Sequence, residues 1–232
     1  MKQFFLQIQS IADTASTLPT EETLSVWELM TSGGLGAQLV MVTLLIFSII
    51  TVYIFVERYS AIKKAQKEDV AFMNNITEFV HANKLDAAKA LCQTTDTPVA
   101  RMIEKGIVRI GKPLSDIGTA IENSGKLEIY KLENNLATLA TIAGAAPMIG
   151  FLGTVIGMIL AFFEMAKAGG QVDVEMLSNG IYTAMTTTVA GLTVGIMAYI
   201  GYNMLVAKVE KVVFKLEATT TEFLDVLNER TT

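Results

Sequence analysis

Hydroxyl side chains gather inside apolar stretches of this sequence. Thr154 lies in one such stretch, and four threonines fall within six residues of another, namely Thr183, Thr186, Thr187 and Thr188. A threonine hydroxyl in a helix can line a path for water or an ion, or it can bond a carbonyl one turn back. Lipid-facing positions do not favour so many hydroxyls, so these side chains should face protein or water. Their spacing leaves helix packing and a hydrated path equally open.

Small residues surround these threonines. Two G-x-x-x-G patterns, one in each stretch, permit close approach of helices. Pro147 removes one helical hydrogen bond and can kink the first of the two segments. We therefore expect helix packing to involve a set of small residues and one proline: Pro147, Gly150, Gly153, Gly157, Gly191 and Gly195.

Ionisable side chains are missing where a proton carrier would need them. No Asp, Glu, Lys or Arg occurs in residues 29–56, 134–163 or 176–207. Threonine does not titrate near pH 7, and proton relays usually carry an ionisable group inside the membrane. If protons cross here, the titrating carboxylate must therefore come from another polypeptide. Glu164, at the edge of the second stretch, is either a headgroup-level carboxylate or a proton entrance.

Other chemistries find little support. The run from Gly106 to Pro113 nearly matches a phosphate-binding loop, but Pro113 stands where a Ser or Thr hydroxyl should meet Mg²⁺, so we interpret it as a turn between helices. His81 is the only histidine and Cys92 the only cysteine, and we interpret Cys92 as a small buried apolar residue. We expect no enzyme, metal site or cofactor. A net charge of −5 gives no nucleic-acid footprint.

The elements that must position these residues are membrane-spanning helices. Of 232 residues, 51% are hydrophobic, and the mean hydropathy is +0.45. A spanning helix needs roughly 20 apolar residues, and we place three, at residues 35–56, 136–163 and 180–207. The linking segment 57–135 and the tail 208–232 have helical periodicity. Thr97 and Pro98 should cap and begin one helix, and a helix opening near Pro113 should run unbroken into the second span.

Basic residues set the orientation. One, Lys2, precedes the first span, twelve lie between the first two spans, one, Lys167, lies in the hairpin at 164–179, and four follow the third span. Positive residues favour the inside, so the N-terminus is expected outside and the loop and C-terminus inside. Residues 1–34 should include an interfacial helix around Trp27. The predicted class is an all-α membrane protein with an inner helical bundle, and three spans are few to enclose a pore, so we expect an oligomer.

The stretch from Ala143 to Met158 resembles the second-span signature of the ExbB/TolQ/MotA proton-channel family, and of ExbB most closely. Gly180-Ile181 and the run from Thr188 to Leu192 are similar to that family's third span. The resemblance implies a pentamer in the bacterial inner membrane, with a periplasmic N-terminus and a cytoplasmic C-terminus. It also implies two partners: an ExbD/TolR-like single-span protein whose aspartate binds the proton, and a TonB/TolA-like protein.

By position, Thr154 and Thr188 match the pore threonines of that family. Thr183 stands where ExbB-like chains often have a glutamate, so either Thr183 or Glu164 takes over that role, or the route differs. Sodium coupling and a branch with another output both stay open. The resemblance thus implies the ring-forming stator subunit of a motor driven by the proton-motive force. The competing hypothesis is a non-conducting membrane scaffold that organises partner proteins through its helical cytoplasmic region.

Overall fold

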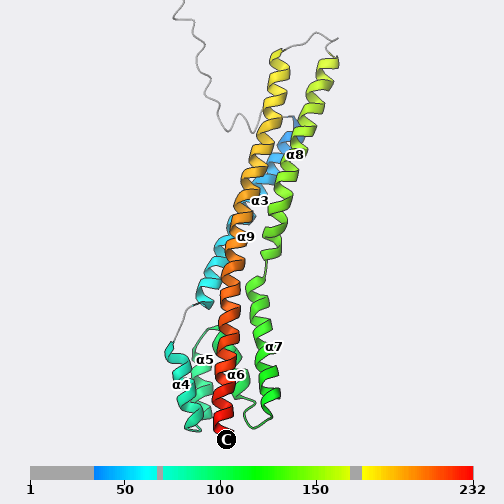
Figure 1. Cartoon of the computed structure of the whole chain (residues 1–232). Coiled ribbons are helices and arrows are strands. Elements are labelled where there is room, and N and C mark those ends of the chain that lie inside the picture. Colours follow the sequence, from blue (N-terminus) through cyan, green and yellow to red (C-terminus); the bar gives the residue numbers. More distant parts are fainter. Residues whose placement is uncertain (1–33, 67–69, 168–173, 232) are drawn as a thin grey trace, which may run out of the picture.

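A computed structural model describes residues 34–66, 70–167 and 174–231, and in these ranges the chain is helical apart from short turns. Three long apolar helices are able to cross a membrane, which confirms the predicted all-helical class with three spans. They are α3 (Leu35–Ala65), α8 (Leu136–Lys167) and α9 (Val174–Thr231). All three lie side by side over the upper part of the molecule (Figure 1).

Four shorter helices complete the described chain: α4 (Val70–His81), α5 (Leu85–Thr94), α6 (Pro98–Ile107) and α7 (Leu114–Glu133). They gather around the C-terminal part of α9, at the end away from the C-terminus of α8 (Figure 1). Thr97 caps α6 as expected, because its hydroxyl accepts a 3.3 Å hydrogen bond from the backbone amide of Ala100. The expected interfacial helix around Trp27 falls in residues 1–33, outside the described residues.

Two buried clusters hold the helices together. The larger lies in the lower bundle, where Ile62, Ile76, Ile103, Ile121 and Phe223 come from five helices and are 1% exposed or less. The smaller lies among the three long helices and is built by Val40, Leu44, Ile142, Ala146, Val194 and Ala198. Long apolar surfaces of α3, α8 and α9 stay exposed outside these clusters, as expected for helices that face lipid or other chains.

The expectation of one unbroken helix into the second span was wrong. α7 ends at Glu133, Asn134 leaves the helical conformation with φ of −52° and ψ of 137°, and α8 begins at Leu136. Asn135 has φ of 63°, in the left-handed region that asparagine tolerates better than most residues. The two consecutive asparagines therefore separate the bundle helix from the membrane helix.

Candidate ion pathway and helix interface

The interface between α8 and α9 is built from glycines at matched positions. A Cβ on Gly191 would lie 2.6 Å from the carbonyl oxygen of Ala146 and 2.9 Å from Cα of Gly150. Closer to the C-terminus of α8, a Cβ on Gly157 would lie 2.9 Å from Cβ of Ala184. Such separations leave no room for a side chain, so the two antiparallel helices touch through their backbones. The register brings Gly150 and Gly191, two of the predicted packing residues, directly together.

The same register continues at Pro147. A Cβ on Gly195 would lie 2.6 Å from the Pro147 ring and 3.2 Å from the carbonyl oxygen of Ala143. Pro147 has no amide hydrogen to offer that carbonyl, and it lies inside α8. Gly195 therefore gives space to the ring that interrupts the hydrogen bonding of α8.

Thr187 is a packing residue of the three-helix interior. It is 1% exposed, and a Cβ on Gly153 would lie 2.5 Å from its hydroxyl oxygen and 3.1 Å from Val40 of α3. Its hydroxyl donates to the carbonyl of Ala184 at 2.7 Å and is 3.2 Å from that of Gly150. Three helices thus enclose this hydroxyl, and it has no open side.

Thr188 and Thr154 instead lie on one flank of the α8–α9 interface. The Thr188 hydroxyl donates to the carbonyl of Gly150 at 3.1 Å, and the Thr154 hydroxyl donates to that of Phe151 at 2.6 Å. Both residues are only half-buried. Two residues seven positions apart in an α-helix lie on nearly the same face, because their separation is only about 20° short of two full turns. Thr154 is seven residues after Pro147 and therefore shares its face of α8. Thr188 is seven residues before Gly195 and shares its face of α9. Since Pro147 meets Gly195, the two threonines lie at one height on the same side.

The remaining predicted pathway residues lie apart from this pair. Thr183 and Thr188 are five residues apart, which places them about 140° apart around α9, and Thr183 is half-buried. Glu164 lies at the far end of α8, where its carboxylate pairs with Lys167 at 3.4 Å. The Lys167 ammonium also lies 4.4 Å from the centre of the Phe163 ring. The structure therefore does not bring Glu164 to the Thr154–Thr188 flank.

A network of charges that the sequence analysis did not find ties α3 to the lower bundle. The Arg58 guanidinium donates to the carbonyl of Lys131 at 2.9 Å. The Lys131 ammonium pairs with Glu128, which in turn pairs with Arg101, each at 2.7 Å. Arg101 then pairs with Asp96 at 2.7 Å, and Asp96 with Lys64 at 2.6 Å. Because Arg58 and Lys64 are both on α3, the network forms a closed loop through α7, α6 and the turn before α6.

The carboxyls of this loop stay ionised. Burial raises the pKa of Glu128, but hydrogen bonds from Arg101 and Lys131 outweigh it and hold that pKa below its usual value. The hydrogen bond from Lys64, together with the charges of Lys64 and Arg101, lowers the pKa of Asp96. The sequence alone does not reveal this loop, because residues that bond each other in it, such as Arg58 and Lys131, are up to 73 positions apart.

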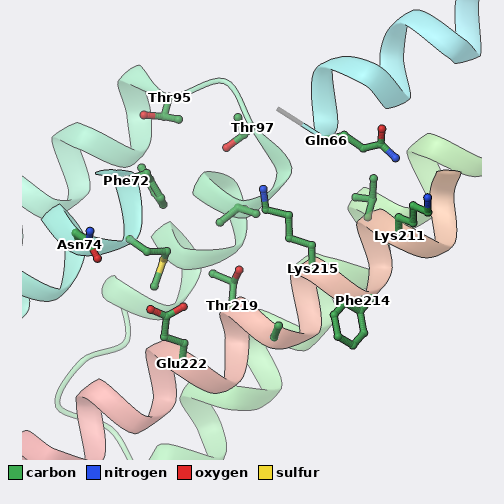
Figure 2. Close-up of a pocket in the computed structure, with 14 residues that line it drawn as sticks. Gln66, Phe72, Asn74, Thr95, Thr97, Lys211, Phe214, Lys215, Thr219 and Glu222 are labelled. Atoms are coloured by element: carbon green, nitrogen blue, oxygen red, sulfur yellow. The ribbon is translucent and has the colours of Figure 1, made fainter. Parts of the chain in front are cut away.

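A pocket of about 640 Å³ opens between α4, α9 and the turn before α6. Figure 2 shows Phe72 and Asn74 on α4 and Thr95 and Thr97 on the turn before α6, with Thr219 and Glu222 on α9. Phe214 points to the other side of α9, away from Thr95 and Thr97 (Figure 2). The lining is mixed, and no three His, Cys, Asp or Glu side chains come together as metal ligands within the described ranges. We assign this pocket no chemistry.

The resemblance to a phosphate-binding loop has no structural counterpart. Residues 108–113 form the turn between α6 and α7, as interpreted from the sequence, and Gly111 has φ of 99°. A Cβ on Gly106 would lie 2.7 Å from Ile121 and 2.8 Å from Phe223, so this glycine packs three helices.

Cys92 is buried, and that burial, with a smaller contribution from Glu104, raises its pKa to about 12.

Comparison with known proteins fits this arrangement. The family model described as the MotA/TolQ/ExbB proton channel family matches residues 94–218, which is more than half of the chain. The chain belongs to the MotA/TolQ/ExbB family. It is 25% identical to the Tol-Pal system protein TolQ of Pseudomonas aeruginosa over 217 residues, covering 89% of this chain and 94% of that protein. It is 29% identical to TolQ of Haemophilus influenzae over 208 residues, covering 80% and 86%.

An ExbB relative is similar over a shorter stretch. The biopolymer transport protein ExbB of Aquifex aeolicus is 37% identical over 113 residues, covering 48% of this chain and 76% of that protein. The membrane character expected for a MotA/TolQ/ExbB protein agrees with the three apolar helices.

Proposed function

We propose that this chain is the ring-forming stator subunit of an inner-membrane motor driven by the proton-motive force. The observation that carries the proposal is the placement of Thr154 and Thr188 at one height on one flank, with half-buried hydroxyls. Thr187 is enclosed beside them and fixes the helix pair that presents them. Repeated around a pentamer, this flank lines a hydroxyl-bearing pore.

The chain supplies the pore wall, and a partner supplies the acid. The apolar stretches at 134–163 and 176–207 contain no Asp, Glu, Lys or Arg. An ExbD/TolR-like single-span partner seated in the pore brings an aspartate that takes up a proton on one side and releases it on the other. One charge crossing 100 mV is worth about 2.3 kcal/mol, so a few protons power a mechanical step. The step turns the partner against the ring. A TonB- or TolA-like protein transmits this motion to the outer membrane, where the processes that it drives include TonB-dependent import.

The orientation follows the basic residues. Spans at 35–56, 136–163 and 180–207 place the N-terminus and the 164–179 hairpin in the periplasm. The bundle at 57–135 and the tail at 208–232 then lie in the cytoplasm. Lys208 and Lys211, which directly follow the third span, are among the positive charges that favour this side. The charge loop from Arg58 to Lys64 fastens the first span to this bundle.

The test is proton flux through the chain co-purified with a single-span partner and reconstituted in vesicles. Thr154→Val and Thr188→Val should each lower the flux by about tenfold, as for one lost hydrogen bond on the pathway, while the complex stays assembled. Thr193→Val is the matched control, since the exposed Thr193 hydroxyl donates only to Val189 one turn back, at 2.8 Å. Undiminished flux in both variants would refute the pore role. No proton flux from an assembled complex would instead favour the non-conducting scaffold, and replacing H⁺ by Na⁺ as the driving ion tests sodium coupling.

A further inference from the structure

Three large apolar side chains are exposed on the described surface outside the apolar spans. On α7, Tyr130 is 76% exposed and Leu127 is 64% exposed, and on α9 Phe214 is 73% exposed. Charged residues separate them from the spans: Lys131 and Glu133 on α7, and Lys208 and Lys211 on α9. Lipid therefore does not cover these side chains. An apolar patch of this kind outside lipid marks a contact with protein.

The patch residues of α7 and α9 lie at one height. The two helices run antiparallel beside each other (Figure 1). A cavity between them is lined by Gly125 and Ile129 from α7 and by Leu216 and Thr220 from α9. The residue after Ile129 is Tyr130, and Phe214 lies two residues before Leu216, so both aromatic rings lie within about one turn of the same level. In a cyclic ring around an axis along the bundle, each residue meets neighbours at its own height.

The charges beside the two rings are complementary. Lys211 lies one turn before Phe214 and Glu133 one turn after Tyr130, so in antiparallel helices both charges lie on the side of the apolar spans. Both are exposed, and neither forms an ion pair with another described residue of the chain. When the Phe214 ring of one copy lies beside the Tyr130 ring of the next copy, Lys211 of the first copy therefore lies beside Glu133 of the second, one turn closer to the apolar spans.

We propose that Phe214 and Lys211 of one copy dock on Tyr130, Leu127 and Glu133 of the next copy, forming a collar below the membrane. This inference rests on the ring proposed above and names the surface that joins its subunits. The contact is head-to-tail, since the α9 surface of each copy meets the α7 surface of its neighbour. The Phe214 and Tyr130 rings supply the aromatic contact, and the Lys211–Glu133 pair sets the register.

The test is crosslinking between two differently tagged full-length copies expressed together in membranes. One carries Tyr130→Cys and the other Phe214→Cys, both with Cys92→Ala, and a short bismaleimide should join them into a dimer carrying both tags. Asp225→Cys replaces Phe214→Cys in the control. Asp225 is exposed on almost the same face of α9, but eleven residues further on, or about 16 Å lower. We expect at least about tenfold less product from the control.

A charge exchange provides the second measurement. Glu133→Lys in the Tyr130→Cys copy should lower the Tyr130–Phe214 crosslink several-fold, and Lys211→Glu in the Phe214→Cys copy should restore it. If the two tags co-purify but the Tyr130–Phe214 yield equals that of the control, the docking surface is wrong while the motor proposal stands. Crosslinks between two Phe214→Cys copies in place of the mixed pair would likewise overturn the head-to-tail contact. Tags that never co-purify would overturn the ring, and with it the proposed function.

Discussion

Gly150 and Gly191 face each other across α8 and α9 with no space for a methyl group between them. A Cβ on Gly150 would lie 3.1 Å from Cα of Gly191, and one on Gly191 would lie 2.9 Å from Cα of Gly150. The same Gly150 carbonyl is within hydrogen-bonding distance of the hydroxyls of Thr187 and Thr188. Close backbone contact and the placement of the threonines are therefore one property of this crossing.

The first prediction concerns Gly191→Ala. The new Cβ would meet the carbonyl oxygen of Ala146 at 2.6 Å, so the helices must separate, at a cost of about 1–3 kcal/mol. Unfolding of the purified protein in mixed detergent micelles measures this loss. Gly144→Ala is the control, because nothing lies within 4 Å of a Cβ on that residue of α8. Equal stability of the two variants would contradict the close crossing.

The second prediction separates packing from the pathway within the threonine group. Thr187→Val keeps the shape of the side chain but removes the hydroxyl that donates to Ala184. The expected cost is about 0.6–1.7 kcal/mol in the unfolding assay, as for hydrogen bonds between membrane helices. Thr186→Val should cost less, since the Thr186 hydroxyl bonds only Tyr182 one turn back and is not enclosed. A destabilisation by Thr186→Val equal to that by Thr187→Val would argue against the enclosed position.

Part of this architecture follows from the sequence. The three spans could be predicted because apolar runs without charge must be long enough to cross a bilayer, and three such helices are present. The Thr97 cap could be predicted because a cap needs only a local hydroxyl and a following proline, and it is present. Both depend on neighbouring residues alone.

Other features depend on contacts that no local pattern encodes. Periodicity continues across Asn134 and Asn135, so the sequence predicted one helix where the chain has two. Two adjacent asparagines were the available signal, because asparagine tolerates the left-handed conformation. The flank shared by Thr154 and Thr188 requires the α8–α9 register, which the Pro147–Gly195 contact reveals. The loop of salt bridges and one hydrogen bond through Glu128 joins residues far apart in the chain.

The third prediction tests how the end of α7 is held. Arg58→Leu removes the donor to the carbonyl of Lys131 and leaves that acceptor unpaired, which costs about 1–3 kcal/mol where the site stays dry. Amide hydrogen exchange around Asn134 and Asn135 should become faster while the α8–α9 crossing stays protected. Lys63→Leu, at an exposed position of the same helix, should leave the exchange unchanged. Faster exchange in both variants would assign the effect to charge alone.

The fourth prediction concerns Cys92. Burial and Glu104 raise its pKa to about 12, so at pH 8 only about one thiol in ten thousand is ionised. Maleimide should therefore label the folded protein very slowly and label it fully after denaturation in SDS. Asp225→Cys provides the exposed comparison, because that position of α9 is exposed and lies outside the proposed docking surface. Rapid labelling of Cys92 in the folded wild type would show that the lower bundle opens.

The last prediction is a loss of stability in acid. Burial raises the pKa of Glu128, but the hydrogen bonds from Arg101 and Lys131 lower it further, so the net shift is downward. A carboxyl whose pKa is lower in the folded state stabilises the fold above its unfolded pKa of about 4.3 and loses this contribution as the pH falls through the folded pKa. Unfolding measured from pH 7 to pH 3 should show stability falling below about pH 5.

Glu128→Gln isolates that contribution. The variant keeps the shape but loses the charge, so it should be less stable than wild type at pH 7 by about 1–3 kcal/mol, as for a hydrogen bond to a charged group. The difference should shrink as the pH falls below the unfolded pKa towards the lowered folded pKa of Glu128, because the contribution of the wild-type carboxylate is lost over that range. Glu122→Gln is the control, since Glu122 is exposed and pairs only with Lys126 one turn along α7. If the unfolding free energies of wild type and Glu128→Gln fell in parallel as the pH was lowered, Glu128 would not contribute to the acid sensitivity of the bundle.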